Sequence, residues 1–396
     1  MSKRIDSALV LAFVFTAGLS VGGLWLLHRV APDLLPNLGR SPQHPPSVVP
    51  QGLTQLTLLG DTFSGYSTFR SQGFQQALAA SQIQLRYADE FDQAKRTHAL
   101  NQGQADLLVT TLDQFLKQQP QGKIVGLIDR TVGADAVILN TRKYPTLKSL
   151  LDLTQLVARS RSQGPPLAIA FAGDTPSEYL ALVLDTQFEA FNLSDFQIQK
   201  VADASAAWKQ LQDPSQPVAI AVLWEPYVTQ ARHQGYTVVL SSEDAPGAIV
   251  DVIVASQPLM EHQPQAITDF LAAYYRRIDA NTRDSSQLQV QIANDGKLSP
   301  QDASAVLQGI EFFTAPEAQT WMTDGTLKRR MNAIAAVLTL SGRLNQVPPD
   351  PASLFTSRFL TSAANNTQTL ISLVRADSPD LADRLAGKSR AIPTPP

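Results

Sequence analysis

The chain has 396 residues, of which 44% are hydrophobic and 17% charged, and its net charge at pH 7 is −3. This composition is typical of a folded globular protein, and the length suggests two lobes rather than one core. The small negative charge gives no general attraction to nucleic acid, so nucleic-acid binding is not expected. The chain has no cysteine, which excludes disulfides, thiolate nucleophiles and cysteine-ligated metal sites.

The N-terminal residues predict attachment to a membrane. Lys3 and Arg4 precede an uncharged apolar run over residues 8–27, and about 20 apolar residues are enough to cross a bilayer. Residues 1–30 are therefore predicted to be a transmembrane anchor or uncleaved signal, although a cleaved signal stays open. The positive residues favour a cytoplasmic N-terminus, which puts the folded part on the periplasmic or extracellular face of the cytoplasmic membrane. Residues 31–52, rich in proline, are predicted to be a linker.

From residue 53 onward, predicted strands and helices alternate. In a first round the strands are expected at residues 53–59, 83–87, 105–110, 122–128 and 134–140, with helices at 69–80, 91–102 and 147–156. In a second round the strands are expected at 167–171, 198–201, 219–224, 238–241 and 249–255, with helices at 178–190 and 204–212. Beyond residue 258 the pattern is mainly helical, and residues 376–396 are predicted to be a disordered tail. This alternation predicts an α/β protein with mostly parallel sheets.

Residues 219–231 give the first indication of a binding site. Their apolar run ends in Trp224-Glu225-Pro226-Tyr227, and the proline is expected to end a buried strand. Ligands of open α/β sheets bind outside the carboxyl ends of the strands, so Trp224 and Glu225 are candidate pocket residues. Alternatively, the tryptophan packs in the core and the glutamate faces water.

Hydroxyl side chains recur where predicted strands lead into helices, at residues 64–67, 110–111 and 174–177. Helix N-termini can hold a small anion, although simple helix capping is the alternative at each place. Arg70 and Arg130 are candidate contacts to an anion, or else exposed surface residues. The sequence shows no catalytic motif and no metal-ligand spacing among its five histidines, so neither an enzyme nor a cofactor is predicted.

Several motifs together resemble the solute-binding proteins of nitrate, sulfonate and taurine ABC importers, a family that includes a thiamine-precursor branch. The matching residues are Gly60-Asp61 with Ser64-Gly65-Tyr66, Ala99-Leu100-x-x-Gly103-x-Ala105-Asp106, Gly173-Asp174-Thr175-Pro176-Ser177, Trp224-Glu225-Pro226-Tyr227 and Pro246-Gly247-x-Ile249-x-Asp251. The resemblance implies a bilobal periplasmic-binding-protein fold of type II, with two Rossmann-like lobes. It places lobe 1 at residues 53–140 and 251–375 and lobe 2 at 141–250, with hinge strands near 134–140 and 251–256.

The same resemblance implies a function and a binding site. A monomer would capture a small anionic or zwitterionic solute, such as nitrate, a sulfonate or taurine, and deliver it to an ABC permease. The ligand-binding residues carried over are Ser64, Gly65, Tyr66, Thr110, Thr111, Thr175, Ser177, Trp224, Glu225 and Asp251. The alternative is a membrane-tethered envelope sensor or scaffold with this fold and no transport role.

Overall fold

The computed structural model describes residues 52–388, except residue 190, and the chain from Leu53 onward forms one compact unit. The predicted membrane segment, nearly all of the predicted linker and the last eight residues of the predicted tail lie outside the described residues. Within the described part of the chain, no helix has the length and apolarity needed to cross a bilayer.

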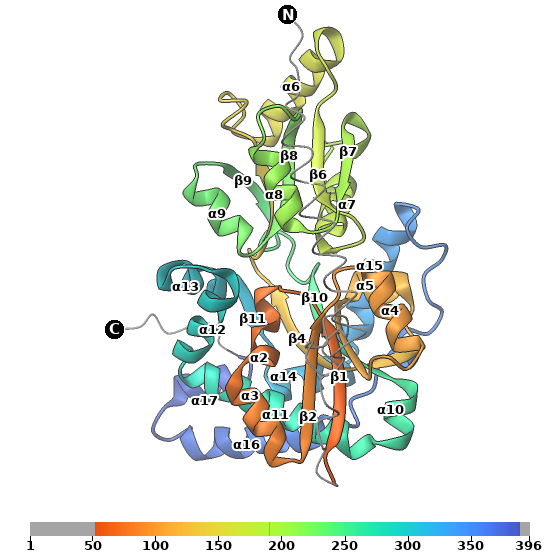
Figure 1. The fold of residues 1–396 in the computed structure, drawn as a ribbon, viewed down its shortest axis with the longest axis vertical. Helices are drawn as coiled ribbons and strands as arrows, with labels where there is room; N and C mark the ends of the chain where they lie inside the picture. Colours follow the sequence, from red (N-terminus) through yellow and green to blue (C-terminus); the bar gives the residue numbers. More distant parts are fainter. Residues whose placement is uncertain (1–51, 190, 389–396) are drawn as a thin grey trace, which may run out of the picture. The chain divides into compact units, whose positions relative to one another are not determined.

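The first sheet has six strands in the order β11-β4-β10-β3-β1-β2 (Figure 1). Their bounds are β1 Thr54–Gly60, β2 Ile83–Asp89, β3 Leu107–Thr111, β4 Gly122–Thr131, β10 Val250–Ser256 and β11 Ile310–Phe312. Strand β1 pairs in parallel with β2 and β3, whereas β10 runs antiparallel between β3 and β4. Strands β3 and β10 are buried along their whole length, as expected for central strands with helices on both faces.

The second sheet has five strands in the order β7-β6-β8-β5-β9. Their bounds are β5 Asp135–Leu139, β6 Ala168–Ala172, β7 Gln197–Val201, β8 Val218–Trp224 and β9 Thr237–Ser241. Strand β6 pairs in parallel with β7 and β8, and β5 runs antiparallel between β8 and β9. In both sheets a parallel trio is followed by an antiparallel strand and then by β4 or β9, in agreement with the repetition predicted from the sequence, and the first sheet has β11 as an additional edge strand.

The chain passes between the sheets twice, at residues 132–134 and 242–249. These passages differ from the hinge strands expected near 134–140 and 251–256, because β5 and β10 are each hydrogen-bonded on both sides within one sheet. We call residues 135–241 the second half and the other described residues the first half. The predicted lobe boundaries, and the idea that the halves move as independent lobes, remain predictions.

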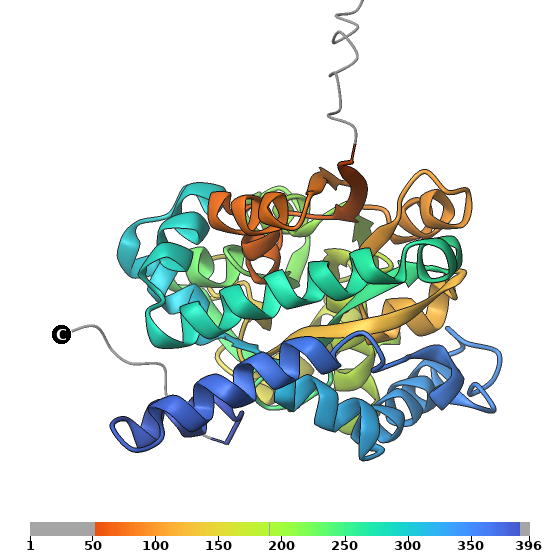
Figure 2. The ribbon, with the colours of Figure 1, turned by 90° about the horizontal axis from the view of Figure 1, so that it is seen from below.

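Helices cover both sheets. Those of the first half are η2 Ser64–Tyr66, α2 Ser67–Arg70, α3 Gln72–Ala80, α4 Gln93–Asn101, α5 Leu112–Gln118, α10 Gln257–His262, α11 Pro264–Arg283, α12 Ser286–Gly296, α13 Pro300–Gln308, α14 Ala315–Thr323, α15 Thr326–Leu340, η4 Pro351–Leu354, α16 Thr361–Val374 and α17 Pro379–Leu385. Those of the second half are α6 Leu150–Gln163, α7 Pro176–Gln187, η3 Leu193–Asp195, α8 Ala204–Gln212 and α9 Tyr227–His233. Figure 2 shows the long helix α11 beside α16, against which it packs.

The apolar residues of strand β6 show how alternation builds the core of the second half. Ile169 and Phe171 belong to the apolar cluster on one face of the sheet, and Ala168 and Ala170 belong to the cluster on the other face. Successive side chains of a strand point to opposite faces, so a strand covered on both sides is apolar throughout. The small alanines leave room for Trp208 of helix α8, which lies in their cluster.

The prediction of a disordered tail over residues 376–396 is wrong for its first part. Helix α17 lies within it, and Ala382 and Leu385 are fully buried in a small cluster with Ile371 of α16. Pro379 at the first turn is compatible with a helix start, because its missing N–H would have no partner there in any case. The prediction of disorder followed from the proline-rich end of the chain and overlooked this short helix.

Candidate functional site

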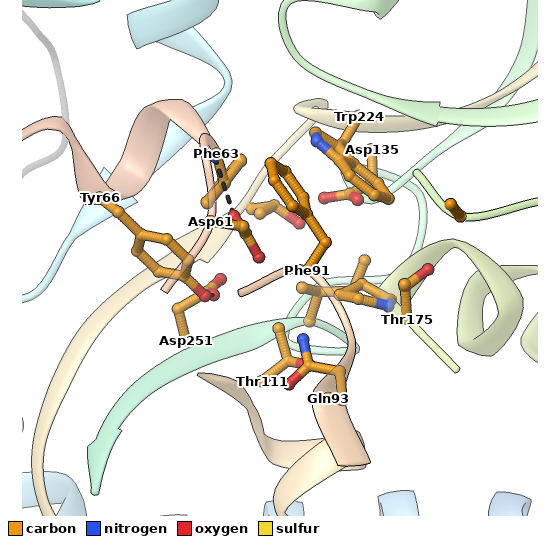
Figure 3. Close-up of a pocket in the computed structure, with 14 residues that line it drawn as sticks. Asp61, Phe63, Tyr66, Phe91, Gln93, Thr111, Asp135, Thr175, Trp224 and Asp251 are labelled. Carbon is orange, nitrogen blue, oxygen red and sulfur yellow. Dashed lines mark hydrogen bonds between the residues drawn. The ribbon is translucent and has the colours of Figure 1, made fainter. Parts of the chain in front are cut away.

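A cavity lies where the parallel strands of both sheets end, with about 470 Å³ of empty volume including the part open to solvent (Figure 3). Its lining comes from both halves of the chain and consists of Asp61, Phe63, Tyr66, Phe91, Gln93, Thr111, Thr131, Asp135, Thr175, Pro176, Ala202, Trp224, Ile249 and Asp251. This is the position at which open α/β sheets bind ligands, beyond the carboxyl ends of the strands.

The structure brings half of the sequence-predicted site residues to this cavity. Those that line it are Tyr66, Thr111, Thr175, Trp224 and Asp251. Those that do not line it are Ser64, Gly65, Thr110, Ser177 and Glu225. Whether the five lining residues contact a solute remains a prediction.

Trp224 is half-buried and lies at the end of β8, in the second half. It also packs against the larger apolar cluster, most of whose residues belong to the first half. In the antiparallel pairing of β5 and β8, Trp224 stands directly opposite Asp135, and opposed residues of a β-pair share one face of the sheet. The indole and the Asp135 carboxyl therefore form one wall of the cavity (Figure 3).

Glu225 has a structural role that neither sequence interpretation described. It is only 1% exposed, and its carboxylate accepts hydrogen bonds from the Thr229 N–H at 3.0 Å and the Thr229 hydroxyl at 2.9 Å. Burial raises the pKa of Glu225 to about 7, although these two hydrogen bonds favour the charged form. The side chain thus holds the first turn of helix α9 and faces neither water nor the cavity.

On the side of the first sheet, two buried aspartates lie next to each other. Asp129 of β4 and Asp251 of β10 are paired in the strand register, and the Tyr66 hydroxyl donates a hydrogen bond to Asp251 Oδ1. Burial, and next the charge of Asp129, raise the pKa of Asp251 well above its usual value, and burial raises the pKa of Asp129 to about 8. Two carboxylates this close retain a proton between them at neutral pH.

Gly65 contributes to this arrangement by having no side chain. A Cβ atom built at Gly65 would lie 2.4 Å from Asp129 Oδ2 and 2.5 Å from a ring carbon of Phe63. The backbone of η2 can approach the aspartate pair only because residue 65 is a glycine. Gly65 and its neighbour Ser64 therefore support the wall that carries Tyr66, although they do not line the cavity themselves.

Asp135 is the buried carboxyl of the second half. It is 2% exposed, and burial raises its pKa to about 7, with further increases from the charges of Asp113, Glu225 and Asp61. The nearby Thr131 hydroxyl opposes this shift. No cationic side chain in the described part of the chain forms an ion pair with Asp135.

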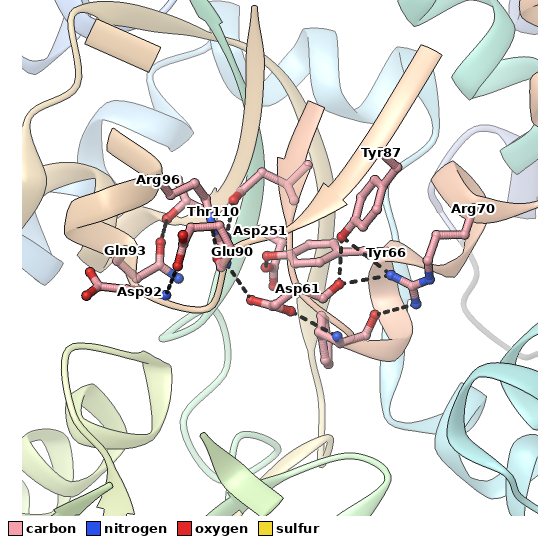
Figure 4. A network of polar contacts seen from close by, with 12 residues as sticks. Asp61, Tyr66, Arg70, Tyr87, Glu90, Asp92, Gln93, Arg96, Thr110 and Asp251 are labelled. Carbon is pink, nitrogen blue, oxygen red and sulfur yellow. Dashed lines mark hydrogen bonds and ion pairs between the residues drawn. The ribbon is translucent and has the colours of Figure 1, made fainter. Parts of the chain in front are cut away.

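Arg96 holds the segments that follow β1 and β2, as the polar network in Figure 4 shows. This fully buried arginine of helix α4 forms an ion pair with Asp61 at 2.9 Å and donates hydrogen bonds to the carbonyl oxygens of Glu90 and Val109. Asp61 also accepts the Phe63 N–H at 2.9 Å. The guanidinium therefore ties together the ends of β1, β2 and β3, and its donors are directed at the protein.

The two arginines proposed to contact an anion form ion pairs with carboxylates outside the cavity lining. Arg70 pairs with Asp295 at 2.8 Å, and Arg130 pairs with Glu311 and Glu317, each at 2.8 Å. Neither lines the cavity, and neither is the exposed surface residue that the alternative expected, because Arg70 is partly buried and Arg130 only 5% exposed.

Two of the predicted hydroxyl loops serve capping and positioning. The Thr175 hydroxyl accepts the Ser177 N–H at 3.2 Å at the start of helix α7, which is the predicted cap. The Thr110 hydroxyl donates to Gln93 Oε1 at 3.0 Å. Thr110 thus acts one step behind the cavity, by orienting a glutamine that lines it.

Sequence reasoning missed several lining residues that a consistent use of strand ends could have found. Asp61 and Phe63 follow β1, and Phe91 and Gln93 follow β2. Thr131 and Asp135 gave no such signal, because they flank a passage between the sheets that the sequence alone did not locate. No group of His, Asp or Glu among the described residues has the geometry to hold a metal ion.

No protein-family model matches the sequence, and no curated protein sequence matches it. Solved structures share its fold. A ligand-binding component of an ABC-type import system from Staphylococcus aureus, determined with zinc bound, has a TM-score of 0.60 and 13% identity over 79% of this chain and 99% of that chain. The periplasmic aliphatic sulphonate-binding protein SsuA from Escherichia coli has a TM-score of 0.57 and 16% identity over 76% of this chain and 92% of that chain.

The periplasmic nitrate-binding protein NrtA from Synechocystis PCC 6803 has a TM-score of 0.59 and 10% identity over 83% of this chain and 91% of that chain. The resemblance inferred from the sequence motifs is thus confirmed at the level of the fold. Identities this low establish the fold and leave the ligand to be argued from the site.

Proposed function

We propose that this chain is a solute-binding protein that captures a small solute in the cavity described above and delivers it to an ABC importer. The observation that carries this proposal is the cavity itself, lined from both halves at the strand ends of a fold shared with solute-binding components of importers.

The oligomeric state, location and candidate solutes in this proposal are those expected from the sequence. The chain would act as a monomer on the periplasmic or extracellular side of the cytoplasmic membrane, held there by residues 1–30, and would catalyse no reaction. The sequence-based candidates for the solute are nitrate, a sulfonate or taurine. The tethered sensor or scaffold considered as an alternative depends on the predicted anchor and on the proline-rich end of the chain, and no observation at the cavity favours it.

Ligand binding by the purified full-length chain tests the proposal. A ligand present at about 100 times its Kd adds about 2.7 kcal/mol to the free energy of unfolding, so a screen of small solutes by thermal unfolding should reveal it. The screen would contain nitrate, sulfonates and taurine, together with small ammonium compounds. The proposal is contradicted if no solute of either kind raises the unfolding temperature.

Tryptophan fluorescence then locates the binding event. The chain has four tryptophans, of which Trp224 lines the cavity. A true ligand should change the emission of the parent protein, and this change should be largely lost in the Trp224→Phe variant. Trp208 lies in the core of the second half, so Trp208→Phe is the matched control and should keep the response.

A further inference from the structure

The charges that line the cavity are of one sign. Among the described residues of the lining, three carry carboxyl groups, Asp61, Asp135 and Asp251, and none is Lys, Arg or His. A site for an anion normally presents arginine, lysine or free backbone N–H groups to it. This lining therefore lacks the side chains that a nitrate or a sulfonate would need.

Cationic side chains near the cavity do not supply the positive charge that its lining lacks. Arg96 neutralises Asp61 and is 0% exposed, so it cannot turn towards a solute. Lys117 is paired with Asp174. In the described part of the chain, neither Asp135 nor the Asp129–Asp251 pair forms an ion pair with a cationic side chain.

The N-termini of helices α7 and α5 do not supply a free anion site either. At the start of α7, the Ser177 N–H is used by the Thr175 hydroxyl and the Asp174 N–H by the Glu178 carboxylate at 2.8 Å. At the start of α5, the buried carboxyl of Asp113 lies in the first turn. An acidic group in the first turn already interacts favourably with the positive end of the helix dipole.

A second buried carboxyl group lies in the cavity wall. Asp251 is 1% exposed, its Oδ1 accepts the Tyr66 hydroxyl, and it retains a proton together with Asp129. A positive charge placed near this pair favours its ionised form.

Aromatic rings complete a cation-binding surface. Phe91 is 38% exposed despite its size, and Figure 3 shows it near Trp224 and Asp135 within the cavity. Trp224 stands opposite Asp135 in the strand pairing. Aromatic faces attract an organic ammonium group through their quadrupole, with tryptophan the strongest.

We propose that the solute bound in this cavity carries an ammonium group, held by the Asp135 carboxylate and the rings of Trp224 and Phe91. The proposal rests on the proposed function and names the class of its solute. An organic ammonium fits better than a metal ion, because the described residues contain no group of carboxylates or histidines arranged to hold a metal. It differs from the purely anionic candidates expected from the sequence, nitrate and the sulfonates, whereas the zwitterion taurine, also expected, carries an ammonium group.

Calorimetric titration of the full-length chain at pH 8 and constant ionic strength tests this inference. The ammonium probes are tetramethylammonium, choline, ethanolamine and putrescine, and the competing probes, none of which carries an ammonium group, are nitrate, methanesulfonate and zinc chloride. We expect an ammonium probe to bind and the competing probes not to bind. Binding of nitrate, methanesulfonate or zinc without any ammonium probe overturns the inference and leaves the proposed function standing, whereas the absence of binding by every probe contradicts the proposed function itself.

Matched variants connect the binding to the site. Asp135→Asn should lower the affinity for the ammonium probe about tenfold or more, because a charged partner is lost. Phe91→Ala should lower it about two- to fivefold. The controls are Asp377→Asn, at an exposed position, and Phe188→Ala, whose ring is 37% exposed away from the cavity; both should bind as the parent does. Circular dichroism establishes that each variant is folded. Ammonium binding that is unchanged in both site variants overturns the assignment to this cavity.

Discussion

The aspartate pair behind Tyr66 shows how one side chain can make stability depend on pH. Burial raises the pKa of Asp129 to about 8, whereas an unfolded aspartate ionises near pH 3.9. Between these values the native state binds more protons than the unfolded state, so this group makes the free energy of unfolding fall as the pH rises. The loss is complete only above the native pKa.

Asp129→Asn should therefore raise stability, and by more at pH 8 than at pH 5. The amide does not titrate, and it can donate a hydrogen bond to Asp251 in place of the proton that the pair retains. We expect the gain to grow by about 1–3 kcal/mol between pH 5 and pH 8, measured by urea unfolding at several pH values. Parallel pH profiles for the variant and the parent would show that the native pKa of Asp129 is not raised.

Asp135 should make ligand affinity depend on pH in the opposite sense. Burial, with the charges of Asp113, Glu225 and Asp61, raises its pKa to about 7, against the effect of the Thr131 hydroxyl. An ammonium group binds the ionised carboxylate, whose fraction rises about tenfold from pH 6 to pH 8 for such a pKa. The affinity for tetramethylammonium, which does not titrate, should rise by a similar factor.

Titration calorimetry in two buffers of different ionisation enthalpy measures this linkage directly. Binding at pH 7 should release part of a proton from the parent protein and much less from Asp135→Asn. An affinity that stays constant from pH 6 to pH 8 in the parent would contradict the role given to Asp135.

At the scale of single elements, strands were more predictable than short helices. The central strands β6 and β8 are apolar along their length, and the predicted run at residues 134–140 became β5, Asp135–Leu139. Helix α12, Ser286–Gly296, was not predicted, because its sequence is largely polar and only Leu288 and Ile292 are buried. Helix α5 has only seven residues, too few to show a helical period.

The site was predictable where it follows the strand-end rule and not where it depends on tertiary contacts. Trp224 and Thr111 end predicted strands and line the cavity. Glu225 follows Trp224 but turns to Thr229, and no pattern in the sequence distinguishes these two orientations. Asp135 could be found only once its pairing with Trp224 was known.

Arg96 is the side chain by which helix α4 holds three strand ends together. Arg96→Met would leave Asp61 and the carbonyls of Glu90 and Val109 without this donor, and breaking a buried pair costs about 3–5 kcal/mol. Urea unfolding should show a loss of this size. The control is Lys95→Met on the same helix, whose side chain is 72% exposed and which should change stability by less than about 0.5 kcal/mol.

A double variant distinguishes two causes of destabilisation by Arg96→Met, the unpaired carboxylate of Asp61 and the lost packing of the arginine side chain. Asp61→Asn removes the carboxylate that Arg96→Met leaves unpaired. The double variant should therefore recover part of the loss seen in Arg96→Met. A double variant that is destabilised by the sum of the two single effects would show that the ion pair does not account for the stability.

For the described chain as a whole, the question is what holds the two halves against each other. Arg343, which follows α15 in the first half, pairs with Glu178 of α7 in the second half at 2.8 Å, and Lys117 of α5 pairs with Asp174. Proteins of this fold respond to ligand by closing two lobes about a hinge. These cross-connections should then favour the closed arrangement and, with it, ligand binding.

Removing these two ion pairs should weaken ligand binding without changing a residue of the cavity lining. In the double variant Lys117→Met and Arg343→Met, a smaller fraction of molecules is closed, and the apparent Kd rises in inverse proportion to that fraction. Partly exposed ion pairs contribute at most about 1 kcal/mol each, so we expect a rise of about three- to tenfold, with a larger radius of gyration in X-ray scattering of the ligand-free protein. Arg161→Met is the control, because Arg161 pairs with Asp195 within the second half. Equal affinity and equal scattering of the double variant and this control would mean that the halves do not open about these contacts.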